Sequence, residues 1–140
     1  MFRTGIVSSI SFCQDYSGLF AAGSLLSAVT LFHENSGENP VAYLDGMTSA
    51  ISQVKFDPVS TYKLYASERH SNRILCWDVR NPFQVLRHFE RSASRTNQKI
   101  SFDIDATGTW LVTGDQVRVM MDSLAYTDGR PRRATSLSSI

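Results

Sequence analysis

The sequence predicts an all-β protein built from repeated four-stranded units, and three observations support this fold class. Short runs of alternating apolar and polar residues end at Phe12, Phe56 and Phe102, at intervals of 44 and 46 residues. Alternation of this kind is typical of a strand with one buried face. The position eight residues after each phenylalanine again holds a large apolar residue. No segment of the chain shows the 3.6-residue apolar period of a helix.

Each copy follows the order strand, turn, strand, with two further strands where the copy is complete. The first strands end at the three repeated phenylalanines, and short apolar runs suited to a buried strand follow. We expect second strands at 20–23 and 110–113, third strands at 28–32 and 74–79, and fourth strands at 41–44 and 85–89. Residues 117–120 are a candidate for a shortened third strand in the third copy.

Four strands in each 40–45 residues, with Trp-Asp closing the third strand, are typical of a WD-repeat propeller. Trp77 and Asp78 form this dipeptide, and Leu31 and Phe32 take its place in the first copy. The Gly-His pair common in such repeats is missing, so the repeats are degenerate. We therefore predict a partial WD-repeat β-propeller of about two and a half to three blades, open and incomplete.

The repeats divide the chain into a propeller part and a tail. We place the propeller at 1–122, with repeats at about 5–45, 46–90 and 91–122, and a disordered tail at 123–140, which lacks a core pattern. Propellers close with four to eight blades, so we expect a piece of a longer propeller. Its two open ends should leave it marginally stable or aggregating when alone.

The alignment of the three repeats also predicts which large side chains are buried. Phe12, Phe56, Phe102 and Trp77 should lie between stacked blades, as equivalent positions of the repeat. Asp105 opens a turn closed by Gly108, and we expect its carboxylate to cap that turn.

Composition excludes several classes of function. Lys+Arg 14 against Asp+Glu 13 leaves a net charge of +1, so no global field attracts nucleic acid or anionic lipid. No apolar stretch is long enough for a membrane helix, so we expect no membrane partner. With two cysteines there is no disulfide-rich scaffold, and the N-terminus does not resemble a secretory signal. A reducing compartment, cytosol or nucleus, fits this usage.

No pattern in the chain suits catalysis or cofactor binding. We find no nucleophile elbow, phosphate-binding glycine loop or paired metal-ligand motif. His33, His70 and His88 stand apart from other ligand types, so we expect no metal, cofactor or small-molecule substrate. Cys13 and Cys76 lie on predicted strands beside aromatic residues and should be small buried thiols. The residues therefore predict a non-catalytic protein.

Three segments, at 96–114, 75–80 and 5–24, resemble the telomerase Cajal body protein family and its fungal relatives linked to spliceosomal small nuclear RNA. The most specific is the first, with Asn97-Gln98 followed by Phe102-Asp103-Ile104-Asp105. The resemblance extends over about 5–115. It implies a seven-bladed, non-catalytic nuclear scaffold of the Cajal body that binds small Cajal-body or telomerase RNA together with ribonucleoprotein proteins. This chain would be about three blades of it.

One cluster of basic residues is a candidate binding surface. In a propeller, the turn between the second and third strands and the link to the next blade open at the same end. The turn of the middle copy and the following link contain the six residues Arg69, His70, Arg73, Arg91, Arg95 and Lys99. Arginine pairs with phosphate and stacks on unpaired bases. The cluster is either a surface for RNA or an acidic partner, or an ordinary solvated loop.

The second reading leaves a different function open. If the loops are only solvated, the chain is a generic WD-repeat scaffold for protein–protein interaction through its propeller faces, with no RNA binding. A subunit of an mRNA-splicing complex would be an example.

Overall fold

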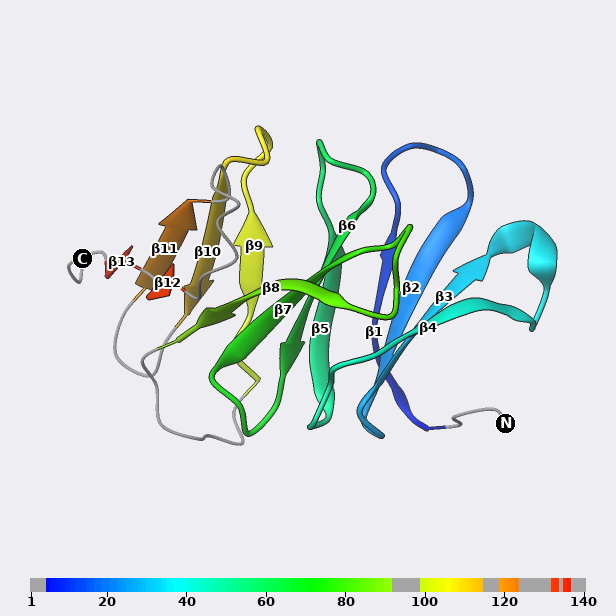
Figure 1. Cartoon of the computed structure of the whole chain (residues 1–140), viewed down its shortest axis with the longest axis horizontal. Coiled ribbons are helices and arrows are strands. Elements are labelled where there is room, and N and C mark those ends of the chain that lie inside the picture. Colours follow the sequence, from blue (N-terminus) through cyan, green and yellow to red (C-terminus); the bar gives the residue numbers. More distant parts are fainter. Residues whose placement is uncertain (1–4, 92–98, 115–118, 124–131, 134, 137–140) are drawn as a thin grey trace.

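The computed structural model describes residues 5–91, 99–114, 119–123, 132–133 and 135–136. These residues form three β-sheets that lie side by side along the long axis of the molecule, as Figure 1 shows. The sheets do not close into a ring. The predicted all-β, open propeller fold is therefore confirmed. No helix in the described part of the chain is long and apolar enough to span a membrane.

We name the sheets blades 1 to 3 in chain order. Blade 1 contains β1 (Val7–Phe12), β2 (Leu19–Ser24), β3 (Ala28–His33) and β4 (Pro40–Leu44), in that spatial order. Blade 2 contains β5 (Ile51–Phe56), β6 (Lys63–Glu68), β7 (Arg73–Asp78) and β8 (Val85–Glu90). Neighbouring strands within both blades are antiparallel. A one-turn 3-10 helix, η1 (Glu34–Ser36), joins β3 to β4.

Blade 3 contains β9 (Phe102–Ile104), β10 (Trp110–Gly114) and β11 (Val119–Ser123). Its third strand therefore overlaps the candidate segment 117–120 and runs further, although 117 and 118 lie outside the described residues. Most of the predicted tail also lies outside them. What is described there is β12 (Arg132–Arg133), paired with β8, and β13 (Thr135–Ser136), paired with β11.

The hairpin registers align the three blades. The same backbone hydrogen bond closes each first turn, from Cys13 N to Leu19 O (2.9 Å), from Asp57 N to Lys63 O (3.0 Å), and from Asp105 N to Trp110 O (3.0 Å). In blade 3, Ile104 thus corresponds to Phe12 and Phe56, and Phe102 lies two residues earlier in the repeat. The sequence pattern instead aligns Phe102 with Phe12 and Phe56. Residues two apart in a strand share a face, so alternation alone does not distinguish the two registers.

Cores between blades come from opposite faces of neighbouring sheets. We call the face toward the preceding blade the leading face and the other the trailing face. One core joins the trailing face of blade 1 to the leading face of blade 2, and a second joins blade 2 to blade 3. Phe56, Phe102 and Trp77 are buried as predicted, with 2%, 3% and 0% exposure.

Phe12 does not follow the prediction. It is 54% exposed, because it lies on the leading face of blade 1, against which the described residues place no sheet. The Trp-Asp position also shifts by one residue in blade 1. Phe32 lies opposite Phe20 as Trp77 lies opposite Leu64, so Phe32 and His33 occupy it.

Side chains on the inner strands connect one blade to the next. The hydroxyls of Ser9 and Ser11 in β1 accept hydrogen bonds from Val54 N and Phe56 N, each at 3.0 Å. One blade further on, the side chain of Gln53 accepts from Phe102 N (3.0 Å) and donates to Phe102 O (2.8 Å). Ser9 and Gln53 occupy the same place in the repeat. The edges of β5 and β9 are therefore hydrogen-bonded by side chains of the blade before each of them.

Candidate nucleic-acid interface

The β6–β7 turn at one end of blade 2 is fixed by the link between β4 and β5. Arg69 N donates to Ala50 O at 2.7 Å, and the Ser49 hydroxyl donates to Arg69 O. His70 has a φ of 53°, which places it in the left-handed region at the tip of the turn. Arg69 is half-buried and His70 is exposed. Both predicted residues therefore lie on an ordered turn open to solvent.

Arg73 is engaged by a buried carboxylate. Its Nη2 donates to Glu68 Oε2 at 3.1 Å and to Thr48 Oγ1 at 3.1 Å. Glu68 is buried, and its other oxygen accepts from Thr48 N at 2.7 Å. The carboxylate thus offsets the charge of Arg73, which is 29% exposed. Glu68 was no candidate in the sequence, since an acidic residue at a strand end ordinarily faces water.

Arg91 lies inside the protein and not on the surface. It is only 4% exposed, and its guanidinium donates to Ser71 O (3.2 Å), Ile100 O (3.4 Å) and Glu68 O (3.5 Å). The sequence predicts an exposed loop position for Arg91, whereas the structure shows a buried one. Ser71 and Ile100 lie outside the strands, in the turn and in the link, and a guanidinium with five donors can bind the backbone carbonyls of both. Arg91 therefore joins the turn to the link into blade 3.

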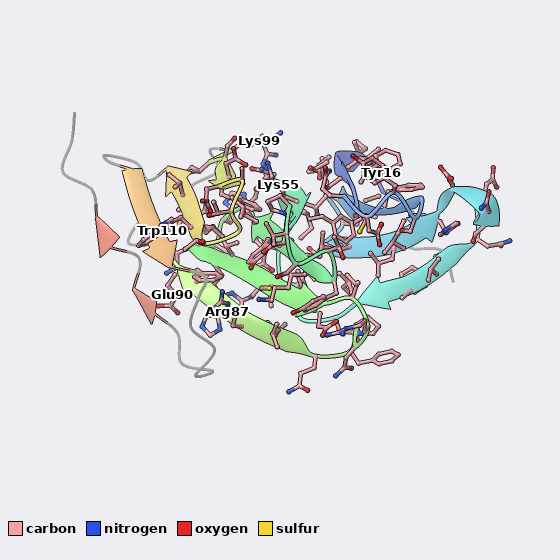
Figure 2. The ribbon with its side chains drawn as sticks, turned by 90° about the horizontal axis from the view of Figure 1, so that it is seen from above. Tyr16, Lys55, Arg87, Glu90, Lys99 and Trp110 are labelled. Atoms are coloured by element: carbon pink, nitrogen blue, oxygen red, sulfur yellow. The ribbon has the colours of Figure 1, made fainter. Side chains whose placement is uncertain are left out.

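The remaining two candidates lie in that link. Arg95 falls outside the described residues. Lys99 is exposed, and Figure 2 shows it on the same side of the molecule as Lys55, opposite Arg87 and Glu90. Within the described part of the chain, Arg69 and Lys99 form no ion pair. The structure thus brings the turn and the link together, but divides the cluster into exposed and internal charges.

The inner strands carry a second polar region that sequence reasoning missed. Lys55 on β5 forms an ion pair with Asp103 on β9, and this holds the pKa of the Asp103 carboxyl below its usual range. The pair borders a hollow of about 760 Å³ along the inner strands of the three blades. Alternation predicted that Asp103 points away from Ile104, but contact between strands 48 residues apart needs the tertiary structure.

The other polar candidates have local roles. Asp105 accepts hydrogen bonds from Thr109 N (2.8 Å) and Trp110 N (2.7 Å), which confirms that it caps its turn. His33 Nδ1 accepts from Asn35 N at 3.2 Å. His88 Nε2 lies 3.9 Å from Glu90 Oε1. The described residues contain no group of three side chains placed to hold a metal ion.

The two cysteines are buried, as predicted. Cys76 is fully buried, and desolvation raises the pKa of its thiol to about 12. Burial also raises the pKa of Cys13, whose thiol donates to Thr61 O at 3.2 Å. A thiol is a weak nucleophile because only the thiolate attacks. Neither side chain is therefore a reactive site.

We expect both cysteines to resist alkylation by iodoacetamide at pH 8 while the protein is folded, and to react fully in urea. Mass spectrometry of the intact protein measures this directly. Tyr16→Cys is the matched control, because position 16 is 98% exposed and a thiol there should react within minutes. Rapid labelling of Cys76 in the native protein would contradict its burial.

Comparison with known structures defines the class of protein. No protein-family model matches the chain. The outer coat vertex of COPII on membranes is similar over 87% of this chain and 34% of that chain, with a TM-score of 0.70 and 16% identity. The COPII coat assembled on membranes gives the same score and identity, with 19% of that chain covered. At this identity the likeness shows the fold alone. The chain is a β-propeller protein with WD-type blades.

Sequence relatives then identify the particular proteins that it resembles. Telomerase Cajal body protein 1 of Mus musculus is 34% identical over 81% of this chain, and that of Homo sapiens is 32% identical over 96%. The homolog of Drosophila melanogaster is 27% identical over 74%. The resemblance to the telomerase Cajal body protein family is thus confirmed.

The extent of the match refines the sequence-based reading. The alignment with the human relative extends beyond the segment 5–115 to which the motifs had limited the resemblance. The chain spans about a fifth of the length of the mouse and fly relatives and 24% of the human one.

Proposed function

We propose that this chain is part of a non-catalytic WD-repeat scaffold that binds small Cajal-body or telomerase RNA and helps to assemble or localise the ribonucleoprotein in the nucleus. The observation that carries the proposal is the sequence relation to telomerase Cajal body proteins over most of the chain. Their name associates those relatives with telomerase and with the Cajal body. A scaffold role also suits the blade architecture, which offers loop ends and faces as binding surfaces.

The proposed contacts with RNA are at the end where the β6–β7 turn and the link into blade 3 meet. Lys99 supplies an exposed charge and Arg69 a half-buried one, and exposed His70 lies beside Arg69 at the tip of the turn. Arg73 and Arg91 have a supporting role, because Glu68 and backbone carbonyls engage their guanidinium groups. Arg95 is part of the proposed surface because it lies in the same link, between Arg91 and Lys99 in the sequence. Phosphate contacts by such side chains give affinity without sequence specificity.

The double variant Arg69→Ser/Lys99→Ser should bind RNA more weakly than the wild-type chain. Each lost phosphate contact on single-stranded RNA reduces the slope of log K against log salt by about 0.7, so two contacts reduce it by about 1.4. Fluorescence anisotropy with a labelled telomerase RNA, measured over a salt series, gives both quantities.

Lys63→Ser/Arg80→Ser is the matched control, since it removes the same charge from the opposite end of blade 2. Lys63 begins β6 and Arg80 follows β7, both away from the β6–β7 turn. If the two double variants bind equally well, with equal slopes, specific contacts by Arg69 and Lys99 are refuted.

A protein–protein scaffold without RNA binding is the second candidate. The observation in its favour is that two of the predicted bases, Arg73 and Arg91, are already engaged within the protein. Under this function, the wild-type chain and both double variants should show the same residual affinity for RNA, with the same salt slope. The measurement above therefore separates the two candidates.

A further inference from the structure

The turns between the first and second strands of the three blades meet at one end of the molecule, opposite the β6–β7 turn (Figure 1). The Cys13 thiol donates to Thr61 O at 3.2 Å, which joins the β1–β2 turn to the β5–β6 turn. A Cβ at Gly108 would lie 3.1 Å from Val59 Cβ, so the β9–β10 turn adjoins the β5–β6 turn as well. We call this surface the first-turn end. It comprises residues 13–18, 57–62 and 105–109.

An exposed aromatic side chain stands at the tip of the β1–β2 turn. Tyr16 is 98% exposed, and its φ of 60° lies in the left-handed region that bulky residues rarely adopt. The backbone therefore holds a large aromatic ring in water at a defined place. Tyrosine is enriched among the residues that contribute most of the binding energy at protein interfaces.

The first-turn end stays accessible in a blade that has neighbours. Blade 2 has a sheet on either side, yet Val59 and Tyr62 in its β5–β6 turn are 56% and 37% exposed. Contact between adjacent blades thus covers the faces of a sheet and leaves side chains of these turns in water. The exposure of Tyr16 is in keeping with this pattern and does not require an uncovered sheet face.

The charge around the β1–β2 turn is acidic. Residues 4–54 contain four acidic side chains and neither lysine nor arginine. Asp15 is exposed, and hydrogen bonds from the Ser17 hydroxyl and backbone hold the pKa of its carboxyl below the usual range. Glu34 is exposed against the same turn, because a Cβ at Gly18 would lie 2.5 Å from Glu34 Cγ. The turn therefore attracts cations and repels the phosphates of a nucleic acid.

Blade 2 shows which cation suits a carboxylate and a tyrosine together. Arg80 donates to the Asp78 carboxylate from Nε at 2.9 Å and from Nη2 at 2.7 Å. Its guanidinium carbon also lies 4.1 Å from the centroid of the Tyr62 ring. One guanidinium is thus held by charge pairing and by cation–π attraction at once. Asp15 and Tyr16 present the same two chemical groups to solvent.

We propose that the β1–β2 turn binds an arginine-bearing segment of a partner protein, with a guanidinium stacked on Tyr16 and paired with Asp15 or Glu34. Among the described residues neither carboxylate forms an ion pair, so both can pair with an incoming cation. The surface lies at the opposite end of the blades from the turn that carries Arg69. The inference therefore adds a protein partner to the scaffold and does not depend on RNA binding.

A labelled peptide of three arginines separated by glycines tests the contact. Fluorescence anisotropy should show binding to the wild-type chain that weakens as salt rises, because the carboxylates are exposed. Tyr16→Ser should weaken binding roughly tenfold or more, as is typical for loss of an aromatic anchor. Tyr16→Phe keeps the ring and should bind as the wild type does. Asp15→Asn/Glu34→Gln should also bind more weakly, with a smaller salt dependence.

Each change has a matched control at the other end of the blades. Leu26→Ser removes a 61% exposed apolar side chain from the β2–β3 turn. Asp45→Asn/Glu90→Gln removes two exposed carboxylates, one after β4 and one at the end of β8. Both controls should leave the affinity for the peptide unchanged. A wild-type chain that does not bind the peptide overturns the proposal, and so does full affinity in Tyr16→Ser or equal weakening by the controls.

Two further probes define the chemistry of the ligand. A peptide with lysine at each arginine position should bind more weakly, because an ammonium group neither stacks nor pairs in a bidentate manner. Equal binding of both peptides would show charge attraction alone and overturns the arginine site. A labelled telomerase RNA should bind Tyr16→Ser and the wild type equally. Loss of RNA affinity in this variant, with peptide affinity kept, would assign Tyr16 to a nucleic-acid surface and overturn the proposal.

Circular dichroism establishes that each variant is folded. If one does not fold, hydroxyl-radical footprinting of the wild-type chain with and without the arginine peptide decides the question. Oxidation of Tyr16 should fall when the peptide is present, while that of Leu26 stays constant. Unchanged oxidation of Tyr16 at a saturating peptide concentration overturns the contact.

Discussion

Phe56→Ala should lower the free energy of unfolding by about 3–5 kcal/mol, the usual cost of truncating a buried aromatic side chain. Phe56 is 2% exposed in the core that joins blades 1 and 2. Its loss opens a cavity between two sheets whose backbones are already held together by Ser9 and Ser11, so the site has little freedom to collapse. Urea denaturation monitored by tryptophan fluorescence measures the change.

The chain contains its own control for this experiment. Phe12 occupies the same place in the repeat but is 54% exposed, so Phe12→Ala should cost less than about 1 kcal/mol. Equal losses would show that burial between blades does not account for the stability that Phe56 contributes.

Glu68→Ala should cost about 3 kcal/mol. Removing one partner of a buried ion pair leaves the other charge without compensation, at a cost of about 3–5 kcal/mol, and the 29% exposure of Arg73 places this pair at the low end. Thr48 N also loses its acceptor. Because Glu68 holds the β4–β5 link against the β6–β7 turn, we expect the loss to extend to both segments. Chemical denaturation gives the free energy, and hydrogen exchange locates the loosened amides.

Asp78→Ala is the comparison for Glu68→Ala. Asp78 also pairs with an arginine, at 2.7 Å from Arg80 Nη2, but that arginine side chain is 68% exposed. Solvent-exposed pairs contribute about 0–1 kcal/mol, so the change in stability should be small. A similar cost for both variants would mean that burial does not distinguish the two pairs.

Much of the fold follows from local pattern. Alternation and the repeated spacing located most strands of the three blades, and the Trp77-Asp78 dipeptide together with the period defined the propeller class. These features depend on residues close in the sequence, and period two is a property of a single strand. The turn capped by Asp105 was likewise predictable, because its donors are four and five residues away.

The candidate interface was only partly predictable. That the β6–β7 turn and the link into blade 3 lie together follows from propeller topology, as Arg91 and Ser71 confirm. Which bases face solvent does not follow from it. Arg91 is buried where backbone carbonyls of the turn and of the link converge on its guanidinium, and Arg73 is held because Glu68 is buried beside it. Such convergence involves residues that are distant in the sequence.

By itself, the sequence determined that the chain is an all-β repeat protein related to telomerase Cajal body proteins. Strand alternation, repeat spacing and motifs all depend only on the order of residues along the chain. Only the tertiary structure decided which faces are buried. Phe12 and Phe56 have the same place in the repeat, yet one is exposed and the other is not. The difference lies in the neighbouring sheet, because an apolar face is buried only where another blade removes it from water.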